Sequence, residues 1–186
     1  MPFYKTEFPG LFVVEPVIYE DNRGYFFEAY NEKKFREENI DLRFVQDNQS
    51  SSSFGVIRGL HYQLNPHAQA KLVRALNGLI LDVVVDLRKN SPTYAMVFSI
   101  ELSAENKKQL FIPPGFAHGF SVLSERAEVF YKCDEFYNKE SETGIRYDDP
   151  FLNIDWKLPS EKMTVSEKDQ QLPLFADARN NFLFLE

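Results

Sequence analysis

The residues best suited to proton transfer in this sequence are its three histidines, His61, His67 and His118. Imidazole titrates closer to neutral pH than any other side chain, so each histidine is a candidate acid or base. His61 lies in the apolar run Val-Ile-Arg-Gly-Leu-His-Tyr-Gln (56–63), which predicts a strand. A lone histidine on a strand is more often structural than catalytic. His67 falls in a polar loop, and His118 begins another predicted strand, where both roles stay open.

The histidine spacing does not favour a metal site. A stable transition-metal centre needs three or four ligands that converge from fixed positions. No second histidine lies two residues from His61, and position 63 is Gln. We therefore expect no metal and no other cofactor, and acid–base chemistry by side chains alone.

Three further residues are candidates for acid–base chemistry beside His61: a tyrosine, a lysine and an aspartate. Tyr131 shares a strand face with Val129 and Cys133, and an inward-facing phenol needs a hydrogen-bond partner or a function. Lys71 opens a predicted strand, where an exposed edge charge is the alternative interpretation. Asp169 is an outlying carboxylate. Arg23, Arg58, Lys71 and Arg74 interrupt segments of apolar and small residues and are candidates for an anion site, although periodicity does not show that they converge.

Composition limits the partners and the compartment. The 186 residues carry 21 Lys+Arg against 28 Asp+Glu, a formal net charge of −7, which argues against general binding to nucleic acid or anionic membranes. The length predicts a single domain, residues 1–186. Because there is one cysteine, Cys133, and neither a basic leader nor a long apolar run, we expect a cytoplasmic protein without a membrane span.

The elements that must position these residues are mostly strands. Aromatic residues make up 15% of the chain, which favours β structure. In 79–87 every odd position is apolar, the period of a half-buried strand, and Asn77-Gly78 before it predicts a hairpin with 71–76. In 94–102 the even positions are apolar. The other predicted strands are 13–20, 25–30, 44–48, 56–62, 109–112, 118–123 and 128–136.

About ten short strands with little helix predict an all-β antiparallel fold, either a sandwich or a jelly roll. Residues 49–53 contain four consecutive serines and are interpreted as a polar loop. Residues 31–39 predict a short surface helix that begins after a capping Asn31, and Ser166 is expected to cap another helical turn.

Eight short motifs, taken together, closely resemble the dTDP-4-dehydrorhamnose 3,5-epimerase family. They occur in the family's order and cover about Phe12 to Pro173. They are Asp-Asn-Arg-Gly-Tyr-Phe-Phe-Glu (21–28), Phe-Val-Gln-Asp-Asn-Gln-Ser (44–50), Gly-Val-Ile-Arg-Gly-Leu-His-Tyr-Gln (55–63), Ala-Lys-Leu-Val-Arg (70–74), Ile-Pro-Pro-Gly-Phe-Ala-His-Gly-Phe (112–120), Phe-Tyr-Lys-Cys-Asp-Glu-Phe-Tyr (130–137), Gly-Ile-Arg-Tyr-Asp-Asp-Pro (144–150) and Ser-Glu-Lys-Asp (166–169).

The resemblance implies a cupin-type jelly roll without a metal, a homodimer, and a specific substrate. That substrate is dTDP-4-dehydro-6-deoxy-D-glucose, which the family converts to dTDP-4-dehydro-L-rhamnose. It also implies that His61 is the base, Asp169 its orienting partner, Tyr131 the acid on the other ring face, and Lys71 the group near the C4 oxygen. These types suit the chemistry, because a base, an opposed acid and a cation near a forming enolate are needed together.

The resemblance implies further substrate contacts. A neighbouring subunit is expected to contribute Arg23, Phe26 and Glu28 to the nucleotide site. The remaining expected contacts are Gln46, Asn48, Arg58, His118, Tyr137 and Lys168.

The sequence departs from the family's usual wording at Tyr147, where Trp is expected, and in the stretch around Cys133 and Glu135. None of these positions is a proposed acid or base. Four alternatives stay open, because relatives with nearly the same residues can act differently: inversion of one carbon only, a 3,4-ketoisomerase on the same substrate, a non-catalytic sugar-nucleotide-binding cupin, and a metal dioxygenase of the same barrel type.

Overall fold

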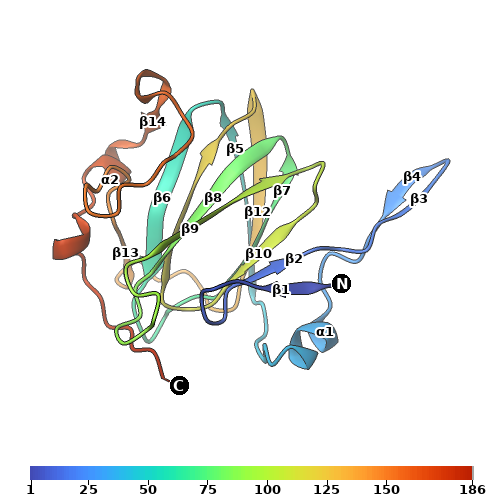
Figure 1. The fold of residues 1–186 in the computed structure, drawn as a ribbon, viewed down its shortest axis with the longest axis horizontal. Helices are drawn as coiled ribbons and strands as arrows, with labels where there is room; N and C mark the ends of the chain where they lie inside the picture. Colours follow the sequence, from blue (N-terminus) through green and yellow to red (C-terminus); the bar gives the residue numbers. More distant parts are fainter. Residues whose placement is uncertain (186) are drawn as a thin grey trace.

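The computed structural model describes residues 1–185, and antiparallel β-sheet dominates it (Figure 1). One large sheet has the strand order β1-β2-β10-β7-β12-β5. Its strands are β1 (Phe3–Lys5), β2 (Phe12–Val14), β10 (Gln109–Ile112), β7 (Lys71–Asn77), β12 (Arg126–Cys133) and β5 (Gln46–Ser53).

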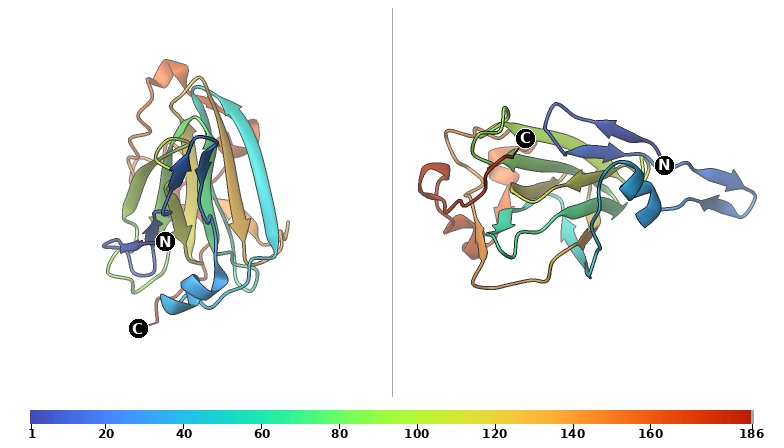
Figure 2. Two further views of the ribbon diagram at one scale, coloured as in Figure 1. Left: turned by 90° about the vertical axis from the view of Figure 1, so that its right-hand side faces the viewer. Right: turned by 90° about the horizontal axis from the view of Figure 1, so that it is seen from below.

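A second large sheet has the order β13-β6-β11-β8-β9, and β14 pairs in parallel with β6. Its strands are β13 (Glu142–Gly144), β6 (Val56–Gln63), β11 (Phe116–Val122), β8 (Leu79–Asp86), β9 (Val97–Ser103) and β14 (Thr164–Val165). The two sheets face each other, as Figure 2 shows. This confirms the predicted all-β, cupin-like antiparallel fold.

Apolar side chains from both sheets fill part of the space between them. The buried cluster joins Val73 and Val129 of the first sheet to Ile80, Val84 and Phe120 of the second. Burial of such side chains contributes roughly 1.5–3 kcal/mol each, so this cluster fixes the distance between the sheets. The rest of the interior is lined by polar side chains, which form the site described below.

Strand β8 is buried on both faces, whereas its alternating sequence predicts burial on one. The odd positions Leu81, Val83 and Val85 pack beneath the C-terminal segment, together with Trp156 and Phe182. Even positions face the interior between the sheets. The sequence pattern is correct in its period, but it does not reveal that the C-terminal segment with Trp156 and Phe182 covers the outer face.

The predicted hairpin at Asn77-Gly78 is wrong. β7 pairs with β10 and β12 in one sheet, whereas β8 pairs with β11 and β9 in the other. Gly78 has a positive φ of 73°, but Asn77 is not in the left-handed region that a type I′ turn requires of both residues. The turn therefore carries the chain from one sheet to the next. A Cβ at Gly78 would lie 2.1 Å from the Arg126 carbonyl oxygen, so only glycine fits there.

The serine-rich segment is a strand rather than the predicted loop. Residues 46–53 form β5, which pairs with β12 along its whole length and lies at the edge of its sheet. Its even residues, from Gln46 to Ser52, are the less exposed ones. Polar residues are tolerated on this face because the strand borders a polar cavity rather than the apolar core. The strand predicted over 94–102 begins later, at Val97, because a turn with Ala95 at φ 64° precedes it.

Two short helices match the sequence prediction. α1 spans Glu32–Glu37, and the Asn31 side chain accepts hydrogen bonds from the amides of Lys33 and Lys34. α2 spans Glu167–Gln170, and the Ser166 hydroxyl accepts one from the amide of Asp169. Single 3-10 turns occupy Ser160–Lys162 and Phe175–Asp177. Within residues 1–185, no helix is long and apolar enough to cross a membrane.

A small hairpin projects from the body of the molecule (Figure 1). It consists of β3 (Tyr19–Asp21) and β4 (Gly24–Phe26), which pair only with each other in the described part of the chain. Its aromatic side chains Tyr19, Tyr25 and Phe26 are all exposed.

Candidate active site

A cavity of about 430 Å³ lies between the two sheets. Polar residues of both sheets and of the segment that joins β12 to β13 line it. The residues that line it are Gln46, Asn48, Ser50, Arg58, His61, Tyr62, Gln63, Gln69, Lys71, His118, Phe120, Tyr131, Tyr137 and Glu142.

His61 on β6 forms a close pair with Asp169 on α2. The His61 Nε2 and Asp169 Oδ1 atoms are 2.7 Å apart, and the Gly59 amide donates to Asp169 Oδ2 at 3.2 Å. Burial raises the pKa of the Asp169 carboxyl. The hydrogen bond and charge of His61, together with the Gly59 amide and the charge of Lys168, lower it by more, so the pKa lies below its ordinary value. An ionised carboxylate only accepts hydrogen bonds, so Nε2 carries the proton and Nδ1 is left free.

A register shift in β6 brings His61 and Arg58 to the same side. By simple alternation, residues 58 and 61 would face opposite ways. The pairing of β6 with β11 instead skips a residue, so that His118 lies opposite His61 while Phe120 lies opposite Arg58. Gly59 is needed at this bulge, because a Cβ there would lie 2.6 Å from the Gly119 Cα. Both His61 and Arg58 consequently line the cavity.

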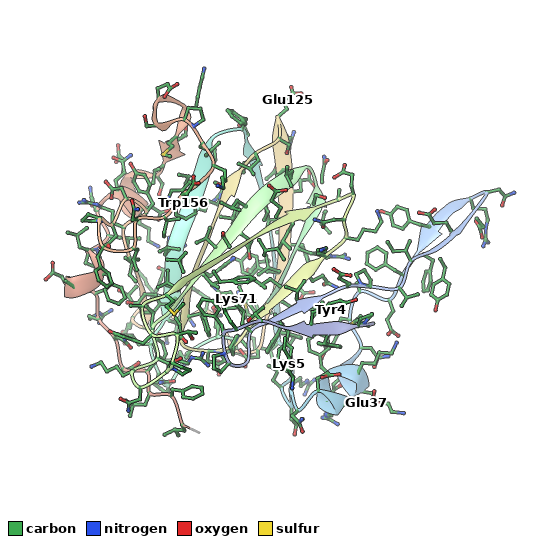
Figure 3. The ribbon with its side chains drawn as sticks, viewed as in Figure 1. Tyr4, Lys5, Glu37, Lys71, Glu125 and Trp156 are labelled. Atoms are coloured by element: carbon green, nitrogen blue, oxygen red, sulfur yellow. The ribbon has the colours of Figure 1, made fainter. Side chains whose placement is uncertain are left out.

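Lys71 and Tyr131 enter the cavity from the first sheet, opposite His61 (Figure 3 marks Lys71). The Lys71 ammonium lies 5.9 Å from the centre of the Tyr131 ring. No carboxylate of residues 1–185 lies within ion-pair distance of it. Burial lowers the pKa of Lys71, and the charges of Cys133, Asp82 and Glu142 oppose that shift. Lys71 is thus inside the site, and the exposed-edge interpretation is wrong.

The Tyr131 hydroxyl is kept protonated at neutral pH. Burial raises its pKa, Cys133 and Glu142 raise it further, and Arg58 opposes them. Tyr131 shares its strand face with Val129 and Cys133, as the sequence pattern predicts.

His118 pairs with a buried carboxylate of its own. Its Nε2 lies 2.8 Å from Asp82 Oδ1, and both side chains are buried, with 7% and 0% of their surface exposed. Asp82 is not among the predicted site residues, because it occupies an even position of the alternating segment 79–87, on the side expected to be polar.

Three residues form a chain of contacts next to His61. Glu142 Oε2 accepts a hydrogen bond from the Tyr137 hydroxyl at 2.9 Å and one from Lys168 Nζ at 2.7 Å. Burial raises the pKa of Glu142, but Lys168, Tyr137 and the charge of His61 lower it more. Tyr137 and Lys168 are predicted site residues, whereas Glu142 was missed. It lies on the three-residue strand β13, too short to produce a periodic signal.

The remaining predicted contacts divide into two groups. Gln46 and Asn48 line the cavity from β5, and the Gln46 side-chain amide donates to Asn48 Oδ1 at 3.1 Å. Arg58 donates to the Ser52 hydroxyl at 3.0 Å.

The second group lies outside the cavity. Arg23 and Phe26 belong to the projecting hairpin, where the Arg23 side chain is 86% exposed and, among residues 1–185, bound only to Asp21. Glu28 contacts Lys34 and Asn31. Arg74 also faces away, over the rings of Phe27 and Phe130, so the four basic residues do not converge on one anion site within this chain.

Gln63, where a second metal-binding histidine would be expected, holds loops together instead. Its side chain donates to the His67 and Phe136 carbonyls and accepts from the Asn138 amide. Among residues 1–185 no group of three or more His, Cys, Asp or Glu side chains is arranged to hold a metal ion.

Comparison with known proteins identifies the family. The family model described as dTDP-4-dehydrorhamnose 3,5-epimerase matches residues 5–177. This chain belongs to that family. A relative from Shigella flexneri, named dTDP-4-dehydrorhamnose 3,5-epimerase, is 50% identical over 179 residues, covering 96% of this chain and 98% of its own.

Two solved structures of family members are similar along nearly the whole chain. The dTDP-4-dehydrorhamnose 3,5-epimerase from Elizabethkingia anophelis is 56% identical, with a TM-score of 0.91 over 95% of this chain and 97% of its own. The dTDP-6-deoxy-D-glucose-3,5-epimerase from Legionella pneumophila was solved in complex with dTDP-4-keto-L-rhamnose. It is 47% identical, with a TM-score of 0.90 over 95% of this chain and 93% of its own.

Proposed function

We propose that this protein is an isomerase that inverts C3 and C5 of dTDP-4-dehydro-6-deoxy-D-glucose, giving dTDP-4-dehydro-L-rhamnose. The observation that supports this most strongly is that a histidine–carboxylate pair, a phenol and an ammonium group line one cavity. The histidine enters from one sheet, and the other two groups enter from the sheet that faces it.

The reaction depends on the C4 ketone. Hydrogens on C3 and C5 are acidic only because this ketone takes up negative charge as an enolate when a proton leaves. His61 takes the proton through its free Nδ1, and Asp169 stabilises the imidazolium that results. Lys71 has no carboxylate partner within residues 1–185, so its ammonium is available to hold the charge on the C4 oxygen.

Inversion needs a proton on the opposite ring face. Tyr131 lies across the cavity from His61, and its raised pKa keeps the phenol protonated until the enolate forms. Base and acid on opposed sheets suit an epimerase, whereas a binding protein gains nothing from this pairing.

The active form is a homodimer in this proposal. Arg23 and Phe26 are exposed on a hairpin that projects from the barrel, and neither lines the cavity of its own chain (Figure 1). Each hairpin, with Glu28 at its base, reaches the nucleotide end of the partner's cavity. The cytoplasm is the proposed compartment, since Cys133 is a buried free thiol.

The test is proton exchange in D₂O. The 4-keto-6-deoxy sugar nucleotide is incubated with the protein and a chelator, and the C3 and C5 signals are followed by NMR. Loss of both signals and formation of the L-rhamno product are expected. Loss of one signal alone assigns a mono-epimerase, and movement of the carbonyl with C5 unchanged assigns a ketoisomerase. No exchange at either carbon contradicts an enzymatic role.

A further inference from the structure

The pair of His118 and Asp82 is a buried ionisable pair in the cavity wall that the proposed reaction leaves unexplained. Its histidine lines the cavity in register with His61 on the neighbouring strand. Since the ring donates through Nε2 to Asp82, Nδ1 is the nitrogen left for the cavity, and it forms no hydrogen bond within residues 1–185. The geometry of His61 with Asp169 is thus repeated one strand away.

Asp82 differs from Asp169 in how its second oxygen is satisfied. Asp169 Oδ2 accepts from the Gly59 amide, whereas Asp82 Oδ2 is buried and has no hydrogen-bond partner in residues 1–185. A buried carboxylate oxygen without a donor is costly unless a cation balances its charge. The His118 ring contacts the other oxygen, and the cationic group of the cavity is the Lys71 ammonium, whose charge Asp82 helps to retain.

Holding the fold together does not account for this pair. β8 and β11 are already joined by seven consecutive register pairs, from Phe116 with Asp86 to Val122 with Ile80. The neighbours of Asp82 on the inner face of β8 are Ile80 and Val84, which pack in the apolar cluster. A third apolar residue would fill this position at no cost in desolvation, since buried ion pairs are often no more stable than apolar replacements.

We propose that Asp82 is a positioning residue for the reaction. Its carboxylate holds the His118 ring with Nδ1 toward the cavity, and its unpaired oxygen supplies negative charge that helps to keep Lys71 cationic near the C4 oxygen. This inference rests on the proposed function. It assigns the buried carboxylate that orients His118 in the cavity and supports the charge of Lys71.

The variant Asp82→Asn removes the charge and keeps the shape. We expect kcat to fall about 10- to 100-fold, with KM and dTDP affinity within about threefold, since the loss is confined to the enolate. The alkaline limb of the kcat profile moves to lower pH, because Lys71 loses a neighbour that favours its charged form. The other groups that act on Lys71, Cys133 and Glu142, are unchanged.

The matched control is Ser121→Ala on β11. Its buried hydroxyl donates to the Trp156 carbonyl on the outer face of the same sheet, so only thermal stability should change. An Asp82→Asn variant that folds and keeps kcat within twofold overturns the proposal. An alkaline limb that does not move also overturns it, because a merely structural role would leave the limb in place. A loss of dTDP affinity as large as the loss of kcat overturns it too, because it would assign the pair to diphosphate binding.

A measurement on the wild-type protein without substrate makes the proposal testable even if the variant does not fold. Long-range ¹H–¹⁵N NMR of the three imidazoles, with His118 assigned from His118→Asn, should show a protonated Nε2 from pH 6 to 8. An unprotonated Nε2 overturns the inference. This result does not depend on turnover, whereas failure of the wild-type protein to exchange C3 or C5 protons counts against the proposed function itself.

Discussion

The two histidine–aspartate pairs are alike in contact and different in setting. His61 and His118 lie opposite each other on adjacent strands, and each is within 2.8 Å of its carboxylate. The His61 side chain is 33% exposed, however, whereas that of His118 is 7% exposed. A histidine that takes protons from ring carbons needs an open approach to them, whereas one held in place by a buried carboxylate can be nearly enclosed. Accessibility rather than pairing therefore separates the proposed base, His61, from His118.

The two carboxylates differ in the number of hydrogen bonds that they accept. Asp169 is held on a short helix by a capped N-terminus and receives two donors, so it is well satisfied while its histidine changes charge. Asp82 lies on a central strand and receives one donor. The carboxylate of the proposed base is thus fully hydrogen-bonded, whereas that of His118 keeps one oxygen without a donor among residues 1–185.

The variant His61→Ala tests most directly whether the more exposed histidine is the base. Exchange at C3 and C5 should fall by about 10²–10⁴-fold, the usual contribution of a general base, while dTDP affinity stays within about tenfold. The assay is deuterium incorporation with calorimetric titration of dTDP. His118→Ala is the matched control, and it should leave exchange easily measurable. Equal losses in both variants would show that exposure does not decide which histidine is the base.

Tyr131→Phe tests the residue opposite the first pair. Inversion should slow by about 10²–10³-fold, because no donor remains on the far ring face. His61 can still remove a proton and return a deuteron to the same face, so exchange without inversion is the signature. Product stereochemistry and deuterium content are measured in one NMR experiment. If exchange and inversion fall together, Tyr131 acts before the enolate forms.

The variant Asp169→Asn tests whether the carboxylate next to His61 acts as an ionised partner. Turnover should fall about 10- to 100-fold, because the amide no longer stabilises the imidazolium. The pKa of Asp169 is lowered in the folded state, so its stabilising effect is present above the ordinary carboxyl pKa near 3.9 and is lost as pH falls through the lower folded value. Thermal melts from pH 6 to 3 should show less acid sensitivity in the variant than in wild type. Equal sensitivity would contradict the ionised pair.

Lys168→Ala should have the smallest effect. Its side chain is 63% exposed, so its ion pair with Glu142 contributes at most about 1 kcal/mol to stability. Because Lys168 neighbours Asp169 on α2, we expect KM to rise about two- to fivefold, with kcat within twofold. Steady-state kinetics distinguish this from a tenfold loss of kcat, which would mean that the surface contact holds Asp169 in place.

Several features of this site could be predicted from local sequence. Tyr131 follows from alternation, and the capped turn that carries Asp169 follows from Ser166. The association of His61 with Asp169 joins residues 108 positions apart, which periodicity cannot predict.

Other features depend on the partners that a segment finds. Asn77-Gly78 has the local chemistry of a hairpin, but β7 and β8 pair with different strands, so tertiary pairing overrides the turn. The serines of β5 form a strand because they border a polar cavity, and Arg58 joins His61 through a bulge that requires the backbone of β11.

The most direct measurement is a crystal structure of His61→Asn with the 4-keto-6-deoxy sugar nucleotide bound. The sugar ring should lie between position 61 and the Tyr131 hydroxyl, with the C4 oxygen toward Lys71 and His118. A ring bound outside this cavity, or one with position 61 and Tyr131 on the same face, would contradict the mechanism.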